Sequence, residues 1–118
     1  MNQIEQLENE LNVMIQRGEI LPAFEKFYAE NVVMQENSEP PVPGKAANRD
    51  REKAFVDSVQ AVHGIKLMRS AANGEVAFGE WLFDVTFKGG GRVKLEQVSV
   101  RQWRDGKVVN ERFYYNKG

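Results

Sequence analysis

The sequence contains few of the side chains that usually do chemistry, since its single histidine is His63 and it has no cysteine. The lack of cysteine excludes a thiol nucleophile, a disulfide and a thiolate metal site. One histidine cannot build the usual multi-imidazole site, and the glutamates that would have to join it, Glu36, Glu80 and Glu96, show no metal-ligand spacing. We therefore predict no metal site.

Two interpretations of His63 stay open. In the first, it is an acid, a base or a hydrogen-bond partner of a substrate. In the second, it ends a helix, where an imidazolium meets the macrodipole favourably. Familiar catalytic motifs do not help, because the sequence has no nucleophile elbow, no Ser-His-Asp order and no dinucleotide fingerprint. The three glycines at positions 89–91 predict a hairpin turn rather than a phosphate loop, since no helix and no Gly-Lys-Ser/Thr follow them.

Large apolar side chains are the second feature with a functional interpretation. They are expected to line the inside of the fold, where such residues usually form a packed core. Next to an opening, the same side chains would line a cavity for a small apolar ligand. The residues predicted to form this lining are Tyr28, Met34, Trp81, Phe83, Trp103 and Tyr114.

Three glycine-marked turns divide the second half of the chain into four strands. Asn73-Gly74 and Asp105-Gly106 are two-residue hairpin signals, and the glycines at 89–91 are a longer one. The predicted strands cover residues 65–72, 75–88, 92–104 and 107–116. Such a meander leaves one sheet face to be covered, and only the upstream part of the chain remains to cover it.

The strand predicted at 75–88 alternates in character. Its odd positions from 81 to 87 are large and apolar, which places them on the concave face under the helices, whereas its even positions are mixed. Gly79 is a plausible bend or bulge, because a straight strand of this length would extend over about 40 Å. For Glu80 and Glu111, an ordinary cross-strand ion pair with Arg101 or Arg112 is an equal alternative to a functional role.

Three helices are predicted upstream of the meander. Apolar residues recur three and four apart over residues 2–17, and Gly18 is well placed to end that helix. Pro22 suits the start of a short second helix that has Phe24, Phe27 and Tyr28 on one face. A short strand at 32–36 and a proline-rich loop at 37–45 come next.

The third helix is predicted over residues 46–62, with Gly64 as its stop. Its buried residues are expected to be Phe55, Val59 and Val62, and its exposed residues Arg49, Arg51, Glu52, Lys53 and Asp57.

Length and composition predict one domain covering residues 1–118. The net charge of −1 gives no reason to expect nucleic acid or an anionic membrane as a partner. No apolar run approaches the roughly 20 residues of a membrane span. Residues 1–10 lack the basic and apolar parts of a secretion signal. We therefore expect a cytoplasmic protein.

Local sequences resemble the NTF2-like superfamily and, within it, the SnoaL-like and ketosteroid-isomerase-like proteins. Residues 27–33, FYAENVV, resemble the segment that joins the second helix to the first strand. Residues 103–109, WRDGKVV, and 111–115, ERFYY, resemble the closing hairpin, and residues 34–41, MQENSEPP, resemble a bacterial SnoaL-like subgroup. The resemblance covers essentially the whole chain. It implies an α+β, NTF2-like (cystatin-like) cone, in which three N-terminal helices pack on a strongly bent, mostly antiparallel sheet.

The resemblance also implies a role for Glu36. It places this residue where ketosteroid-isomerase-like enzymes carry their general base, and an apolar pocket would raise the pKa of such a carboxyl. The alternative is that Glu36 anchors the proline loop. The family's helix-borne tyrosine has no counterpart here, and its strand aspartate is replaced by a choice among Glu96, Gln97 and Ser99.

Two functions therefore stay open. In the first, a SnoaL-like enzyme transfers protons on a small apolar carbonyl compound without a cofactor, as an isomerase, cyclase or dehydratase. Glu36 would be its base, and Tyr28, His63 or Tyr114 would donate to the developing oxyanion. In the second, the domain is not catalytic, and it either binds a small apolar ligand in the same pocket or serves as a dimerisation module.

A homodimer is expected with either function. It would form through the outer sheet face, where Leu82, Val98 and Val100 are too apolar to be left fully in water. The resemblance supports this, since NTF2-like relatives commonly pair through that face.

Overall fold

The computed structural model describes residues 3–117, so the predicted helix start at residue 2 lies outside the described part. Two helices come first, followed by two strands, a third helix and four more strands. Their bounds are α1 Gln3–Gln16, α2 Ile20–Phe27, β1 Tyr28–Glu36, β2 Val42–Pro43, α3 Lys45–Ser58, β3 Val59–Asn73, β4 Val76–Phe87, β5 Arg92–Arg104 and β6 Lys107–Tyr115.

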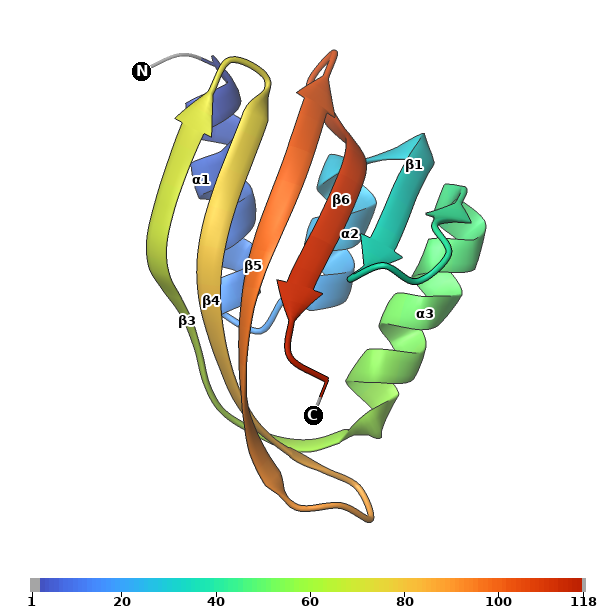
Figure 1. Cartoon of the computed structure of the whole chain (residues 1–118), viewed down its shortest axis with the longest axis vertical. Helices are drawn as coiled ribbons and strands as arrows, with labels where there is room; N and C mark the ends of the chain where they lie inside the picture. Colours follow the sequence, from blue (N-terminus) through green and yellow to red (C-terminus); the bar gives the residue numbers. More distant parts are fainter. Residues whose placement is uncertain (1–2, 118) are drawn as a thin grey trace.

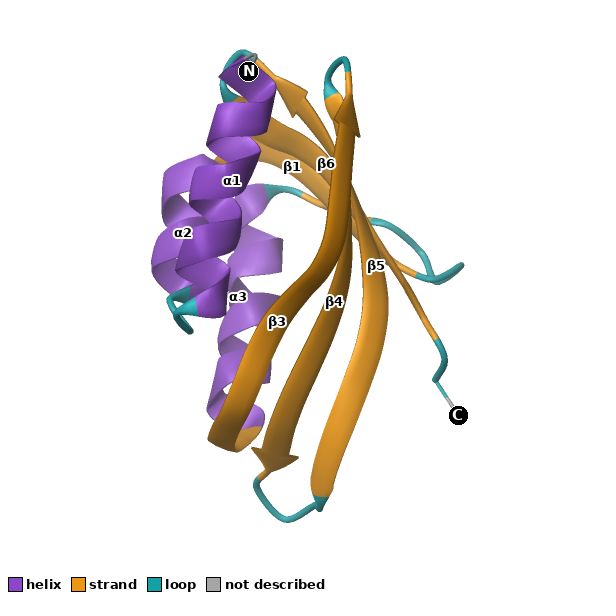
Figure 2. Cartoon of the chain, turned by 90° about the vertical axis from the view of Figure 1, so that its left-hand side faces the viewer, coloured by secondary structure: helices purple, strands orange, loops and turns teal. Residues whose placement is uncertain are grey.

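The described strands form a six-stranded sheet in the order β2-β1-β6-β5-β4-β3 (Figure 1). All neighbours are antiparallel except β1 and β6, which run parallel. The sheet curves, and the three helices lie against one of its faces (Figure 2). The α+β arrangement predicted from the sequence is therefore confirmed. None of the helices within residues 3–117 has the length and apolar character needed to cross a membrane.

The three predicted hairpin turns are all present, and backbone conformation explains why. Gly74, Gly89 and Gly106 have φ values of 62°, 72° and 78°, in the left-handed region that glycine enters without steric cost. Asp105 also has a positive φ, 52°, which aspartate tolerates better than most residues. These turns fold β3 to β6 into a meander.

The third helix ends earlier than the sequence predicted. It stops at Ser58, and Val59 begins strand β3, where it pairs with Phe87 of β4. Val62, predicted to be buried in the helix, is a strand residue with 54% of its surface exposed. Pairing with the full length of β4 satisfies the backbone of these residues, and it overrides the helical interpretation. His63 consequently lies within a strand and not at a helix end.

The core lies between the helices and the concave face of the sheet. The alternation predicted for β4 is confirmed at Trp81, Phe83 and Val85, which are all buried. Tyr28 is also buried, but it begins β1 and does not belong to the second helix.

Gly79 forms no bulge in the pairing with β5, and its lack of a side chain has a role in packing. The pairing of β4 with β5 passes through it without a register shift. A Cβ atom there would lie 2.8 Å from Trp81 Nε1 and 3.2 Å from Ser99 Oγ. Trp81 Nε1 donates a hydrogen bond to Ser99 Oγ over 3.2 Å, so the glycine leaves room for this contact.

Candidate functional site

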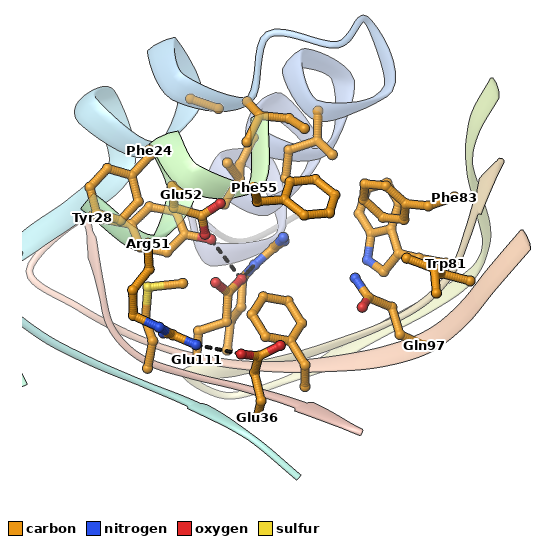
Figure 3. Close-up of a pocket in the computed structure, with 18 residues that line it drawn as sticks. Phe24, Tyr28, Glu36, Arg51, Glu52, Phe55, Trp81, Phe83, Gln97 and Glu111 are labelled. Atoms are coloured by element: carbon orange, nitrogen blue, oxygen red, sulfur yellow. Dashed lines mark hydrogen bonds and ion pairs between the residues drawn. The ribbon is translucent and has the colours of Figure 1, made fainter. Parts of the chain in front are cut away.

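A cavity of about 170 Å³ opens between the helices and the concave face of the sheet (Figure 3). Its walls come from all three helices and from strands β1, β4, β5 and β6. Most of the lining is aliphatic or aromatic. The polar side chains in the lining are Glu36, Arg51, Glu52, Gln97, Arg101 and Glu111, together with the hydroxyl of Tyr28.

A buried ion pair between β5 and β6 forms one wall. Arg101 and Glu111 are 2% and 1% exposed, and Arg101 Nε donates to Glu111 Oε2 over 2.5 Å. This is one of the cross-strand pairs that the sequence offers as an alternative to a functional role, whereas Glu80 pairs with Arg69 of β3 instead. The Tyr28 hydroxyl also donates to Glu111 Oε2, over 2.6 Å (Figure 3). Burial, followed by the charge of Glu111, raises the pKa of Tyr28 far above its ordinary value, so Tyr28 stays neutral.

Helix α1 contributes the second half of this network. Arg101 Nη1 donates to Glu8 Oε2 and to Asn12 Oδ1, both over 2.7 Å. Glu8 Oε1 accepts a hydrogen bond of 2.9 Å from Trp103 Nε1. Burial opposes the charge of Arg101, but contacts with its partners outweigh burial and hold its pKa above the ordinary value. The network therefore fixes α1 to the sheet through charge-assisted hydrogen bonds.

One oxygen of the network is left without a donor. Glu111 Oε1 is buried, and it accepts no hydrogen bond from any residue in the described part of the chain. An unmade hydrogen bond to a buried charged group costs free energy. Glu111 lines the cavity, but Oε1 has almost no accessible surface, so the oxygen without a donor lies just behind the cavity wall.

Glu52 is the second unusual carboxyl. It enters the cavity from α3, and no hydrogen bond joins its side chain to any residue within 3–117 (Figure 3). Burial, reinforced by the charge of Glu111, raises its pKa from the ordinary 4.5 to about 7. Arg51 and Arg101 counteract this shift only in part. Glu52 is therefore balanced between its acidic and basic forms near neutral pH.

Glu36 lies in a more open part of the cavity and has two partners. Its Oε2 accepts a hydrogen bond of 2.5 Å from Arg51 Nη2, and both side chains of this pair are 36% exposed. Its Oε1 accepts a hydrogen bond of 2.6 Å from the Tyr115 hydroxyl. Burial and this bond to Glu36 raise the pKa of Tyr115 to about 12. Glu36 thus joins β1 to α3 and β6.

Gln97 of β5 is the polar group on the opposite wall. Its side-chain amide makes no hydrogen bond to any residue that the structure describes. Figure 3 shows Gln97 and Glu52 entering the same space from different elements. The cavity therefore holds an amide and a carboxyl without hydrogen-bond partners among the described residues, surrounded by aromatic rings.

The structure brings some of the predicted site residues together at this cavity and separates others from it. Tyr28, Glu36, Met34, Trp81 and Phe83 all line it. Trp103 is fully buried behind it and binds Glu8. Tyr114 and His63 are absent from the lining. The exposed His63 Nε2 lies 2.8 Å from Thr86 Oγ1 on the neighbouring strand.

A β-bulge explains the position of Tyr114. In the pairing of β5 with β6, Trp103 pairs with Val108 and Gln102 pairs with Asn110, so Val109 is an extra residue. The bulge reverses the alternation along β6. As a result, Phe113 faces the cavity and Tyr114 faces outward with 44% of its surface exposed.

Sequence reasoning missed Glu52, which was predicted to be exposed within a run of charged residues. Helical periodicity contained the necessary signal. Glu52 precedes Phe55 by three residues and follows Asn48 by four, and such residues share one helix face. Asn48 is fully buried, and Phe55 lines the cavity.

Comparisons with known proteins agree with this architecture. A crystal structure from Mesorhizobium loti, of a protein provisionally named a SnoaL-like polyketide cyclase, is 28% identical, with a TM-score of 0.85, and the alignment covers 97% of this chain and 100% of the other. An NTF2-like protein of unknown function from Burkholderia xenovorans is 18% identical, with a TM-score of 0.74 and coverage of 98% and 84%. A protein from Bacillus subtilis, provisionally named an isomerase, is 21% identical, with a TM-score of 0.77 and coverage of 98% and 90%.

No curated protein matches the sequence significantly. The match to a protein family is nevertheless nearly complete, because the SnoaL-like domain family matches residues 3–115. The structural likenesses add the fold of NTF2-like and ketosteroid-isomerase-like proteins. The chain therefore belongs to the SnoaL-like domain family and has the NTF2-like fold.

Proposed function

We propose that the cavity carries out cofactor-independent proton transfer on a small, largely apolar carbonyl compound, with Glu52 as the group that accepts and returns the proton. The observation that carries this proposal is the unpartnered Glu52 carboxyl in an aromatic cavity, with a pKa raised to about 7. A general base works best when its pKa lies near the working pH. The name of the Mesorhizobium loti protein, a polyketide cyclase, is consistent with carbonyl chemistry.

The proposed step begins with ionised Glu52. Its carboxylate takes a proton from the carbon next to the carbonyl group, the C–H bond breaks, and its electron pair forms an enolate. The amide of Gln97 donates a hydrogen bond to the enolate oxygen, in the manner of an oxyanion hole. Glu52 then returns the proton, either to the same carbon or to another carbon of the conjugated system.

Glu36 stays the alternative base, as the resemblance to ketosteroid-isomerase-like enzymes implies. Its two oxygens are occupied by hydrogen bonds from Arg51 and Tyr115. Glu52 has no such partners, so we place it first. Tyr28 donates to Glu111, which leaves its hydroxyl proton unavailable to a substrate oxygen.

Exchange of α-hydrogens for deuterium tests the proposed step without knowledge of the natural substrate. Small ketones such as cyclohexanone and acetophenone are incubated with the protein in D₂O, and loss of the α-proton signal is followed by NMR. We expect the Glu52→Gln variant to exchange about 10²- to 10⁴-fold more slowly than the wild type, the usual contribution of a positioned base. The matched control is Glu75→Gln, a change of an exposed turn residue that does not line the cavity.

Three outcomes separate the hypotheses. Exchange that fails in Glu52→Gln but continues in Glu36→Gln supports the proposal. Exchange that fails only in Glu36→Gln transfers the role to Glu36. A lack of exchange with any ketone, in the wild type as well, favours the non-catalytic binding module.

We also propose that the outer sheet face forms a homodimer. Phe78, Val98 and Tyr114 are exposed there by 42%, 39% and 44%, and Val98 is paired with Tyr114. The face therefore presents neighbouring apolar side chains to a second copy. Light scattering at micromolar concentration tests this, and a mass equal to that of one chain, 13.5 kDa, would contradict it.

A further inference from the structure

The buried network at the back of the cavity carries more negative than positive charge. Glu8 and Glu111 share the single guanidinium of Arg101, and all three side chains are almost completely buried. The hydroxyl of Tyr28 and the indole of Trp103 add donors but no charge. One carboxylate charge is therefore not balanced inside the network, in surroundings where charge is poorly screened.

The excess charge lies next to the cavity, which Glu111 lines. Every oxygen of Glu8 has a donor, whereas Glu111 Oε1 has none within the described residues. Glu52 presents a carboxyl without a hydrogen-bond donor to this space, and the charges of Glu52 and Glu111 influence each other. Arg101 also lines the cavity, but Glu8 and Glu111 both compete for its charge.

Aromatic rings complete the surroundings. Phe55 and Phe83 pack edge to face with ring centroids 6.5 Å apart, and Trp81 lies 5.9 Å from Phe83. The faces of such rings attract cations, most strongly where water is excluded. A cation in this cavity would therefore meet carboxylate oxygens at one end and aromatic rings along its sides.

From these features we infer that the cavity binds a small organic cation, a protonated amine with a compact apolar body, whose ammonium group donates to the carboxyl of Glu52 and lies over the excess negative charge of the network behind it. An ammonium group supplies both the missing donor and the missing positive charge. A hydroxyl group would supply only the donor, and a carboxylate would add to the repulsion. The inference concerns binding alone, and it holds whether or not the proposed proton transfer takes place.

The size of the cavity limits the body of this ligand. An apolar cavity of roughly 150 Å³ takes up a molecule of the size of benzene. The cavity here measures about 170 Å³, so it suits a single ring or a short branched chain. Fused polycyclic compounds would have to extend out of the cavity or move its walls.

A series of four matched probes tests the inference by calorimetry. Benzylamine is a cation at pH 7, benzyl alcohol is a neutral donor, toluene is apolar and benzoate is an anion. We expect benzylamine to bind about tenfold or more tightly than benzyl alcohol, with toluene weaker again and benzoate weakest, because charge-assisted hydrogen bonds and cation–π contacts favour the amine alone.

Two variants test which carboxylates cause the preference for benzylamine over benzyl alcohol. In Glu52→Gln and in Glu111→Gln, the ratio of the affinities for benzylamine and benzyl alcohol should fall several-fold, while Glu75→Gln should keep the wild-type ratio. Glu52→Gln leaves the buried network intact, so it remains informative even where Glu111→Gln fails to fold.

Proton release gives an independent readout. Four charged groups act on Glu52, namely Glu111, Arg51, Glu36 and Arg101. An ammonium group added to these would lower the pKa of Glu52, so benzylamine binding at pH 7 should release part of a proton and benzyl alcohol binding should not. Calorimetry in buffers of different ionisation enthalpy measures this release. Equal or tighter binding of benzyl alcohol, tightest binding of benzoate, or no binding of any probe would each overturn the inference.

Discussion

The carboxylates on two sides of the cavity differ in how deeply they are buried and in how many hydrogen-bond donors they have. On the sheet and α1 side, Glu8 and Glu111 are almost completely buried, and Arg101, Tyr28, Asn12 and Trp103 donate to them. On the α3 side, Glu52 is less deeply buried and has no hydrogen-bond donor within residues 3–117. Three of the four carboxylate oxygens of the first pair accept hydrogen bonds, whereas burial pushes Glu52 toward the neutral form. The first wall is built for stability, and the second retains a group that can exchange a proton.

The largest expected loss of stability comes from breaking the buried network on the sheet and α1 side. Arg101→Met leaves Glu8 and Glu111 buried without a cation, and removal of one partner of a buried ion pair costs about 3–5 kcal/mol of unfolding free energy. Urea denaturation measures the loss, or shows that the variant is unfolded. The exposed Arg104→Met is the control and should change stability by about 0.5 kcal/mol or less. Equal losses in the two variants would mean that the network does not hold α1 to the sheet.

The next largest effect concerns Glu52 on the α3 side, whose contribution to stability depends on pH. The folded-state pKa of Glu52 is raised from 4.5 to about 7, so the folded protein binds the Glu52 proton more tightly than the unfolded chain does. The stability that this provides is complete below pH 4.5 and is lost as pH rises to about 7. From the size of the shift, the loss amounts to at most about 3 kcal/mol.

Glu52→Gln should therefore be the more stable protein at pH 8, with the difference between variant and wild type shrinking toward pH 4. Urea melts at several pH values measure this. A variant that is less stable than the wild type at pH 8 would show that Glu52 is an ordinary paired carboxylate.

A third prediction concerns the packing of the aromatic wall. Gly79→Ala would place a Cβ atom 2.8 Å from Trp81 Nε1, and overpacking of this kind costs about 1–3 kcal/mol. The tryptophan fluorescence should also change, because the Trp81–Ser99 hydrogen bond must lengthen or break. Gly64→Ala is the matched control on the adjacent strand, where a Cβ atom would have no neighbour within 4 Å. A stable Gly79→Ala protein with an unchanged spectrum would show that this glycine is not required for space.

The smallest expected effect on stability is at the open side of the cavity. The Arg51–Glu36 pair is 36% exposed on both sides, so Arg51→Met should cost about 1 kcal/mol or less. Arg51 lowers the pKa of Glu52, so its loss should move the titration of Glu52 to higher pH. Lys53→Met, an exposed change two residues along the helix, should leave that titration in place. If the titration of Glu52 is unchanged in Arg51→Met, the charge of Arg51 has no influence on Glu52, which would contradict this prediction.

The fold was largely predictable from local signals, because Gly74, Gly89 and Gly106 occupy conformations that favour glycine. The end of α3 could not be predicted from local signals, since it depends on the long-range pairing of Val59 with Phe87. The predicted strand at 65–72 was too short to pair with all of β4, and this mismatch was a signal that the strand begins earlier.

The site was predictable only in part. Alternation along β4 correctly placed Trp81 and Phe83, which line the cavity. Tyr114 was misplaced because a bulge at Val109 reverses the alternation of β6, and single-sequence patterns do not reveal bulges. Glu52 was misplaced because it lies in a charged run, although its spacing from Phe55 puts it on the inner helix face.

Titration of the glutamate side chains by NMR is the most direct test of the contrast between the two walls. With ¹³C-labelled glutamate, the carboxyl signal assigned by its absence in Glu52→Gln should titrate with a midpoint of about 7, far above the ordinary 4.5. The account predicts this shifted signal in the wild type and its loss in the variant. A Glu52 signal that titrates near 4.5 would contradict the account, because it would show an ordinary carboxylate with no special readiness to exchange a proton at neutral pH.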